Sequence, residues 1–422
     1  MSTDRTHLPL WREPTKAQWM SFLAAWFGWI LDAFDFTVFL IVMPRIAADF
    51  HVSITATAWT VTLTLLLRLV GGVLAGAAAD RWGRKLPLML SVLWFATCDG
   101  AIAFAPSFTV VLVLRTLFGL GMGAEWASGA TLAMENWPAR TKGIASGVLQ
   151  GSWAIGYLLA AQVARVVLEG GGSWRTLFLI AAAPAVLVLP IRLWVPDSKP
   201  ALHPAPVSVE AGRAEMAQVW RRIGWGSFYM ALAFSAYYAI SAIYPTLLAK
   251  ELHVDPATTG NLISLFNVGM LVGAVVCGYL ASRWSAVGAI IVCSVLVLPV
   301  LPFYVGWLPG HLGVGAFFGG MFGGGYSGVT PFLLTSMFPA RVRARAVGFV
   351  FHIGACFAAF APTLIARLAE HHGLSFAQSI LLVTGALQLT LAIALVLRPR
   401  NVFDVSVESD AESVPMTAPE PI

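Results

Sequence analysis

Long runs of apolar residues alternate with short polar segments along the whole chain. The runs cover residues 19–43, 57–79, 86–105, 108–134, 143–168, 174–195, 224–249, 259–282, 286–307, 311–337, 344–369 and 375–398. A helix needs about 20 apolar residues to cross a bilayer, and these runs lack the continuous charged face of a helix that lies on the membrane surface. The pattern therefore predicts an all-α membrane protein with twelve transmembrane helices.

Composition points to lipid as the solvent and excludes several other classes of protein. Hydrophobic residues make up 58% of the 422 residues, charged residues make up 11%, and the mean hydropathy is +0.78. A soluble domain carries about 25% charged residues. The net charge of +5 comes from basic residues scattered through short loops, so no nucleic-acid partner is expected. The four cysteines lack metal-ligand spacing, so we predict no metal and no cofactor.

The basic residues indicate how the chain is oriented. One set of loops and ends holds Arg5, Arg12, Lys16, Arg81, Arg84, Lys85, Arg140, Lys142, Lys199, Arg213, Arg221, Arg222, Arg283, Arg341, Arg343, Arg345, Arg398 and Arg400; the other holds Arg45, Arg165, Arg175, Lys250 and Arg367. The richer side is cytoplasmic by the positive-inside rule, which predicts a cell (inner) membrane protein with both termini in the cytoplasm. Residues 1–18 are polar and lack the features of a signal peptide, so the first run is expected to be a retained span.

The chain repeats itself at an offset of about 200 residues. Pro138-Ala-Arg140 returns as Pro339-Ala-Arg341, and Gly76-x-x-x-Asp80-Arg81-Trp82 returns as Gly278-x-x-x-Ser282-Arg283-Trp284. We therefore predict two pseudo-symmetric six-helix halves, residues 1–195 and 223–399. A cytoplasmic linker at 196–222 would join them, and an acidic, disordered tail at 400–422 would follow. Parallel repeats with a substrate site between them describe an alternating-access transporter.

The loop after the second run resembles the signature motif of the major facilitator superfamily. It reads Gly76-x-x-x-Asp80-Arg81-x-Gly83-Arg84-Lys85. The resemblance implies that Asp80, with Arg81, Gly83 and Arg84, forms a latch in which the aspartate interacts with a helix N-terminus of the other half. Ser282 replaces the aspartate in the second copy, so the latch is expected to be asymmetric. The alternative is that the basic residues only anchor the cytoplasmic face.

A narrower resemblance, to the sialate:proton symporter family, covers the N-terminal half. Three stretches carry it, namely Gly28-x-x-x-Asp32-x-x-Asp35-Phe36, Arg68-x-x-Gly71-Gly72, and Arg115-x-x-x-Gly119-x-Gly121-x-Gly123-x-Glu125-Trp126. That family includes lactate carriers. The resemblance implies proton-coupled uptake of a small organic anion, with protons as the coupling ion.

Charged residues inside the runs are candidates for the transport chemistry because each costs at least ~2.5–3.5 kcal/mol at bilayer depth. They are Asp32, Asp35, Arg68, Asp99, Arg115 and Glu125. Asp32 and Asp35 are three apart and share a helix face, where repulsion and desolvation favour the protonated form. We predict proton coupling at Asp32, Asp35 or Glu125 and anion binding at Arg68 or Arg115. The alternative is a permanent structural ion pair between an aspartate and an arginine, and a packing role for Glu125.

The C-terminal half offers only uncharged polar candidates. Asn267 and His352 are predicted to contact the substrate, and Tyr237, Tyr238 and Tyr326 are possible hydrogen-bonding groups. The alternative for His352 is a packing role. Most tryptophans and phenylalanines are expected to face lipid or the membrane interface.

Two other functional classes compete with the symporter. A drug-type efflux antiporter of the same superfamily typically carries a Gly-Pro pair in span five, whereas residues 147–156 contain no proline. A membrane enzyme or receptor is the remote alternative, because the chain shows neither a zinc-protease motif nor a nucleophile elbow. We predict a monomer that is not an enzyme and whose partners are a small organic anion, protons and lipid.

Overall fold

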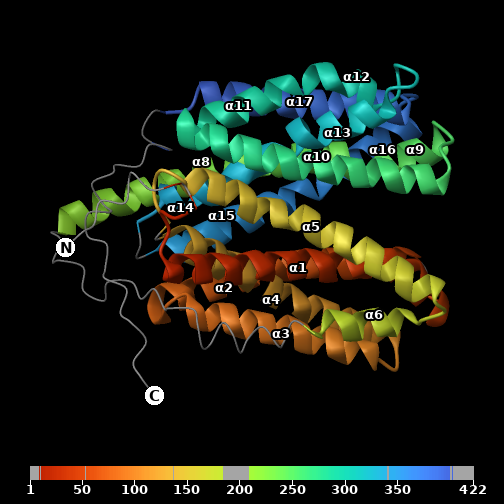
Figure 1. The fold of residues 1–422 in the computed structure, drawn as a ribbon, viewed down its shortest axis with the longest axis horizontal. Helices are drawn as coiled ribbons and strands as arrows, with labels where there is room; N and C mark the ends of the chain where they lie inside the picture. The colour runs from red at the N-terminus through yellow and green to blue at the C-terminus, as the bar shows by residue number, and fades with distance from the viewer. Residues whose placement is uncertain are drawn as a thin grey trace.

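The computed structural model describes residues 9, 11–52, 54–135, 137–183, 209–339, 342–399 and 402, and the regular elements among them are all helical. Figure 1 shows them as a bundle of nearly parallel rods. The first half contains α1 (Lys16–Asp49), α2 (Ile54–Trp82), α3 (Lys85–Ala103), α4 (Phe108–Glu135), α5 (Lys142–Glu169) and α6 (Trp174–Ala181). The second contains α8 (Val209–Ser241), α9 (Tyr244–Lys250), α10 (Pro256–Arg283), α11 (Ala286–Leu296), η2 (Leu298–Val300), α12 (Leu301–Tyr304), α13 (Leu312–Gly323), η3 (Gly325–Val329), α14 (Thr330–Met337), α15 (Arg343–Ala358), α16 (Phe360–His371) and α17 (Phe376–Val396).

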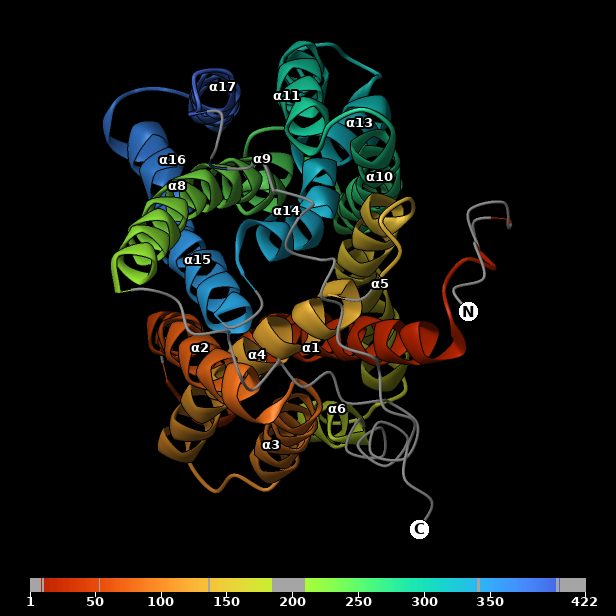
Figure 2. The same cartoon turned by 90° about the vertical axis from the view of Figure 1, so that its left-hand side faces the viewer.

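The helices form the two groups that the sequence repeat predicts. Viewed along the bundle in Figure 2, α1–α6 lie together on one side and α8–α17 on the other. The groups meet mainly where α2 packs against α15 and α5 against α10. These two contacts are related by the repeat, since α2 corresponds to α10 and α5 to α15. The predicted fold of two pseudo-symmetric six-helix halves is confirmed.

Ten helices or helix pairs in the described part of the chain are long and apolar enough to cross a membrane. Of the two other predicted spans, 174–195 runs past the described residues and 311–337 is interrupted by η3. Several spans that were predicted as continuous are broken, and Pro245, Pro302, Pro331 and Pro362 stand in or beside the breaks. Proline lacks the N–H that the preceding turn needs, so breaks at these positions have a local cause.

The segment predicted as a linker, 196–222, needs a correction. The chain is helical from Val209 onward, so the second half of that segment is the start of α8. Alanine, glutamate and arginine are frequent there, and all three favour helix. Residues 196–208 lie outside the described residues, as does the predicted tail at 400–422 apart from Val402.

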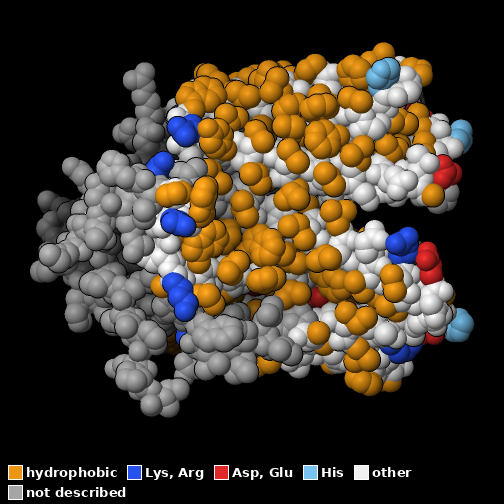
Figure 3. Space-filling model, in the orientation of Figure 1, with side chains coloured by type: hydrophobic (Ala, Val, Ile, Leu, Met, Phe, Trp, Pro, Cys, Tyr) orange, Lys and Arg blue, Asp and Glu red, His pale blue; other side chains and the backbone are white. Residues whose placement is uncertain are grey.

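Two kinds of surface distinguish the sides of the bundle from its ends. Hydrophobic side chains cover the middle of the face in Figure 3, while most of the basic and acidic ones lie toward its two ends. Among the exposed apolar side chains are Leu74, Leu90 and Leu382, each more than half exposed. A belt of this kind suits contact with acyl chains.

The halves are closed at one end of the bundle and separated at the other. We call the end that holds Asp80, Glu135 and Arg343 the Asp80 end. There, a Cβ added to Gly143 would lie 2.5 Å from the carbonyl oxygen of Gly278, so glycine is needed for the close approach of α5 and α10. At the far end, Figure 3 shows a hollow between the halves.

Candidate functional site

Asp80 joins the two halves at the closed end. Gly83 adopts a φ of 97°, which glycine tolerates, and so lets the chain turn sharply between α2 and α3. Asp80 stands on the last turn of α2, and its carboxylate accepts hydrogen bonds from the backbone N–H groups of Ala344 and Arg345, both at 3.0 Å. These residues form the first turn of α15, where free N–H groups and the helix dipole favour an anion.

Three further charged side chains surround this contact. Arg84 is fully buried and lies 3.3 Å from Asp80 and 3.1 Å from Glu135. Arg343 of the other half lies 2.9 Å from Glu135. We call Asp80, Arg84, Glu135 and Arg343 the end cluster. Arg81, which was predicted with this group, is exposed and lies over Trp82 instead.

Sequence reasoning did not select Glu135 or Arg343. Arg343 was counted only as a topology signal. Glu135 is an acidic residue at the end of a span, next to loops that are otherwise basic. This contrast in charge is the sequence feature that could have identified Glu135 as a partner for the basic residues.

The second copy of the motif keeps the geometry but not the charge. The Ser282 hydroxyl accepts a hydrogen bond from the backbone N–H of Ile144 at 3.2 Å, in the first turn of α5. Ser146 adds two hydrogen bonds between the halves, donating to the carbonyl of Gly328 at 2.6 Å and accepting from the N–H of Phe332 at 2.9 Å. The contacts at the two helix starts are therefore alike in position and unlike in charge.

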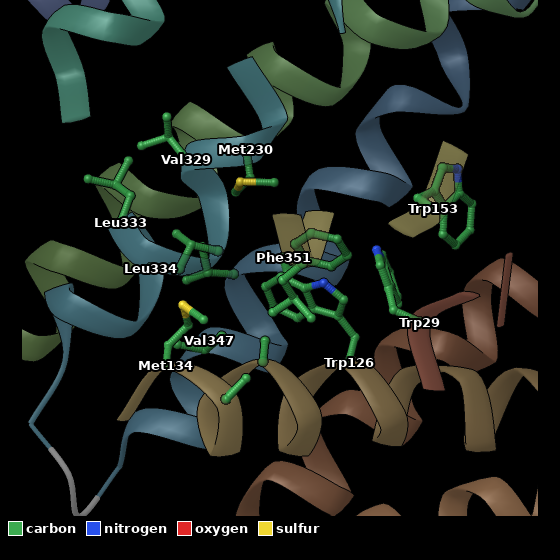
Figure 4. Close-up of a cluster of buried hydrophobic side chains, with 14 of the residues drawn as sticks. Trp29, Trp126, Met134, Trp153, Met230, Val329, Leu333, Leu334, Val347 and Phe351 are labelled. Atoms are coloured by element: carbon green, nitrogen blue, oxygen red, sulfur yellow. The ribbon is translucent and has the colours of Figure 1, made fainter. Parts of the chain in front are cut away.

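A cavity lies between the halves, farther along the bundle. It is lined by Trp29, Arg68, Gln150, Trp153, Met230, Ala233, Phe234, Tyr237, Tyr238, Met270, Tyr326, Ser327, Thr330, Phe351 and Ala355. Arg68 is the one charged residue in this lining. Figure 4 shows Trp29 beside Trp153 and Trp126 overlapping Phe351. Trp126 and Phe351 come from opposite halves and stack with ring centroids 3.5 Å apart.

Arg68 is stabilised by its neighbours but keeps unused hydrogen-bond donors. Its guanidinium carbon lies 5.5 to 5.9 Å from the ring centroids of Trp29, Trp153 and Phe351, a favourable cation–π range. Its Nη2 lies 3.6 Å from Asp32, too far for a hydrogen bond. Neither Nε nor Nη2 has a hydrogen-bond partner among the described residues. Arg68 can therefore offer a planar fork of donors to a carboxylate.

Asp32 and Glu125 share the surroundings of Arg68. Both carboxylates are buried, and Glu125 is close enough to feel the charges of Asp32 and Arg68. A Cβ added at Gly28 would lie 2.5 Å from Oε1 of Glu125, so the missing side chain at Gly28 makes room for this acid. The structure thus brings Asp32, Arg68 and Glu125 together, and we call them the inner group.

Asp35 belongs to a different set of charges. Its strongest charged neighbours are Asp99 and Arg115, with Asp32 of the inner group next, and Arg115 forms an ion pair with Asp99 at 3.2 Å. The guanidinium of Arg115 also lies 4.0 Å from the ring centroid of Phe118. Arg115 is 1% exposed and is absent from the cavity lining, so its contact with the substrate stays a prediction. We call Asp35, Asp99 and Arg115 the outer group.

Asn267 and His352 are also absent from the cavity lining. The amide of Asn267 donates to the carbonyl of Ile263 at 2.9 Å, one turn back along α10. His352 Nε2 lies 3.3 Å from the carbonyl oxygen of Gly123 in the opposite half. Both side chains are therefore engaged with backbone.

The tyrosines and several aromatic residues do line the cavity. Tyr237, Tyr238 and Tyr326 were predicted as hydrogen-bonding groups, and Tyr326 donates to the carbonyl of Ala233 at 2.6 Å. The expectation that aromatic side chains mostly face lipid is wrong for Trp29, Trp153 and Phe351. These side chains surround a buried cation, which hydropathy alone does not reveal.

Comparison with known proteins gives the family. The chain matches the sequence model of the Major Facilitator Superfamily over residues 25–234 and over residues 226–420. It is 29% identical to a probable 4-methylmuconolactone transporter of Cupriavidus pinatubonensis, over 93% of this chain and 94% of that protein. It is 26% identical to the sialic acid transporter NanX of Escherichia coli, over 94% of this chain and 98% of that protein.

Among solved structures, the proton:xylose symporter XylE bound to 6-bromo-6-deoxy-D-glucose has the same fold. Its TM-score is 0.70 at 17% identity, over 90% of this chain and 95% of that one. Because the family model matches both halves, the chain belongs to the Major Facilitator Superfamily and is a multi-pass membrane transporter, not an enzyme.

Proposed function

We propose that the chain is a secondary active transporter that takes up a small organic anion together with protons by alternating access. The observation that carries this proposal is Arg68, the one charged side chain lining the cavity between the halves. Two acids stand beside it within the membrane. The names of the two relatives, which refer to an acid and a lactone, support an organic acid as the substrate class.

The inner group suggests how anion and proton are coupled. In the absence of substrate, Asp32 partly balances the charge of Arg68 from 3.6 Å. A substrate carboxylate that binds Arg68 takes over this balance, so the ionised form of Asp32 loses its support in a buried site. Asp32 then takes up a proton, and anion and proton enter the cavity together. Glu125, beside both residues, is the second proton-accepting group of the site.

The outer group would stand between the cavity and the medium. The Asp35 carboxyl lies within hydrogen-bonding reach of Asp99, and the Asp99–Arg115 ion pair lies next to it. In this proposal Asp35 passes protons between the far end of the bundle and the inner group. Pairing with Arg115 stabilises the charged form of Asp99 at this depth in the membrane.

The basic loops support placing the Asp80 end in the cytoplasm, with both termini on that side of the inner membrane. With that orientation, the structure is closed toward the cytoplasm by the end cluster and hollowed toward the outside. It then corresponds to the state that receives substrate from the medium.

Replacing Arg68 with glutamine tests the substrate class. A charge-assisted hydrogen bond contributes about 1.5–3 kcal/mol, so the Kd for an organic acid should rise by about 10- to 150-fold. Arg68→Lys keeps the charge but loses the fork, so it should fall between the wild type and Arg68→Gln. The measurement is binding and acid-driven uptake in proteoliposomes, for a panel that includes lactate, benzoate and sialic acid.

Arg283→Gln removes an exposed arginine outside the cavity, and its Kd should stay near that of the wild type. Equal affinities in wild type and Arg68→Gln would remove the basis for an anion site at Arg68. Efflux of the acids driven by an inward proton gradient would favour the antiporter over the symporter.

The proposed orientation is tested with single cysteines on opposite ends of the second half. Trp284 and Trp307 are both more than half exposed, the first at the Asp80 end and the second at the far end. In a variant with the four native cysteines replaced, an impermeant maleimide added to intact cells should label Trp307→Cys and spare Trp284→Cys. The reverse pattern would invert the topology.

A further inference from the structure

Two polar side chains that face the cavity have unused hydrogen-bonding capacity. Gln150 on α5 is 6% exposed, and its Oε1 has no hydrogen-bond partner among the described residues. Ser327 on η3, in the opposite half, has a buried Oγ that is likewise without a described partner. Leaving such a group unsatisfied is costly in a buried site, so each is suited to contact a ligand.

The packing of α5 against η3 places these two groups on facing surfaces. Ser146 stands four residues before Gln150 on the same face of α5. It is joined to Gly328 and Phe332 by the two hydrogen bonds described above. The chain through η3 runs antiparallel to α5, so the turn that follows Ser146 on α5 faces the residues that precede Gly328.

The interruption of the helix at η3 is built into the sequence. A Cβ added at Gly325 would lie 2.6 Å from the Cα of Gly273, so η3 approaches the backbone of α10 closely. This approach brings Ser327 to the cavity from a span that would otherwise be a regular helix.

The chemistry of the unused atoms defines what they can bind. The amide oxygen of Gln150 only accepts hydrogen bonds, and a hydroxyl such as that of Ser327 both donates and accepts. A carboxylate offers no donor to Gln150 and is better served by Arg68. Tyr326 in the same lining already donates to a backbone carbonyl.

We propose that Gln150 and Ser327 form a second polar subsite that recognises a hydroxyl group on the transported acid. This inference rests on the proposed function, because it takes the carboxylate to be bound at Arg68. The body of the acid then lies between the two subsites, against the rings of Trp153 and Tyr237. The substrate class becomes hydroxylated organic acids, and Gln150 is the specificity-determining residue.

The test compares acids that differ only by a hydroxyl. Binding to the purified full-length protein is measured for lactate against propionate and for 4-hydroxybenzoate against benzoate. At least one hydroxylated acid should bind roughly tenfold more tightly than its partner, the size expected for one buried hydrogen bond. Gln150→Met should raise the Kd of that hydroxylated acid roughly tenfold and leave its partner within about twofold.

Two variants support the comparison. Gln162→Met, at an exposed position on the same helix, should leave both affinities unchanged. Ser327→Ala removes a single oxygen and should reduce the hydroxyl preference even if Gln150→Met is poorly folded. Melting temperature and monodispersity are checked for each variant.

The outcomes separate the two proposals. If acids bind in an Arg68-dependent manner but no pair shows a hydroxyl preference, the subsite proposal is wrong and the anion site stands. The same holds if Gln150→Met weakens both members of a pair equally. If no acid binds, or if Arg68→Gln binds them as well as the wild type, the proposed function itself fails.

Discussion

Proteoliposomes that carry Asp32→Asn are expected to exchange labelled for unlabelled acid but not to accumulate it when the outside is acidified. Asparagine has nearly the shape of protonated aspartic acid and cannot release a proton. Exchange requires no net proton movement, so it survives. Wild type that couples one proton to one monoanion should concentrate the acid about tenfold per pH unit, and the variant should reach a ratio near one.

A purely structural Asp32–Arg68 ion pair predicts a different result. Removing one partner of a buried pair leaves the other charge uncompensated, so folding or all modes of transport would be lost together. Both modes are therefore measured after the expression level and monodispersity of the variant have been confirmed. Asp35→Asn, three residues away in the outer group, is measured beside it and should also lose accumulation, because Asp35 is proposed to pass the proton to the inner group.

The pair of variants locates the proton-carrying acid. If only Asp35→Asn loses accumulation, the proton is carried by the outer group. If both variants still concentrate the acid, neither aspartate carries the proton, and Glu125 becomes the candidate.

Replacing Asp80 with asparagine is expected to shift the transporter toward the state that is open at the Asp80 end. The change removes the negative charge from the first turn of α15 and leaves Arg84 less well balanced. Loss of one charge-assisted hydrogen bond, about 1.5–3 kcal/mol, changes the closed-to-open ratio by about 10- to 150-fold. Affinity for substrate in the far-end-open state should change little, because Asp80 is remote from the cavity lining.

Distances between the halves give the readout. Spin labels at Trp82 and Trp284, which are both exposed at the Asp80 end, report the separation of α2 from α10 by pulsed electron spin resonance. Arg81→Gln serves as the control, since Arg81 is exposed and lies outside the end cluster. Ser282→Ala should shift the equilibrium less, because it removes one neutral hydrogen bond. Unchanged distances combined with a collapse of substrate affinity would falsify the latch.

Much of the architecture could be predicted because the bilayer imposes simple rules. The length of each apolar run revealed the spans. The two repeated segments, one starting at Pro138 and Pro339 and the other at Gly76 and Gly278, revealed the two halves. The breaks at η3 and between α15 and α16 were missed, since apolar length does not distinguish a continuous helix from a broken one. The start of α8 at Val209 was missed because a charged helix outside lipid has no hydropathy signal.

For the site, the cost of burying charge identified candidates but not their partners. Asp32 and Arg68 were selected by that rule, whereas their separation from the Asp99–Arg115 pair depends on how four helices pack. Gln150 was overlooked because a neutral amide adds little to the insertion cost of a span. The role of Phe351 beside Arg68 depends on contact between the halves, which no local pattern encodes.

Two of the buried ion pairs in the first half have a consequence for how the protein is made. Asp32 and Arg68 belong to the consecutive helices α1 and α2, and Asp99 and Arg115 to the consecutive helices α3 and α4. Each helix alone would carry an unpaired charge into lipid at a cost of at least ~2.5–3.5 kcal/mol. As a hairpin, each pair of helices brings the two charges of its ion pair along together. The second acids, Asp35 on α1 and Glu125 on α4, lie near the arginine of the other hairpin, Arg115 and Arg68 respectively. The first four helices therefore hold both ion pairs before the second half of the chain has been synthesised.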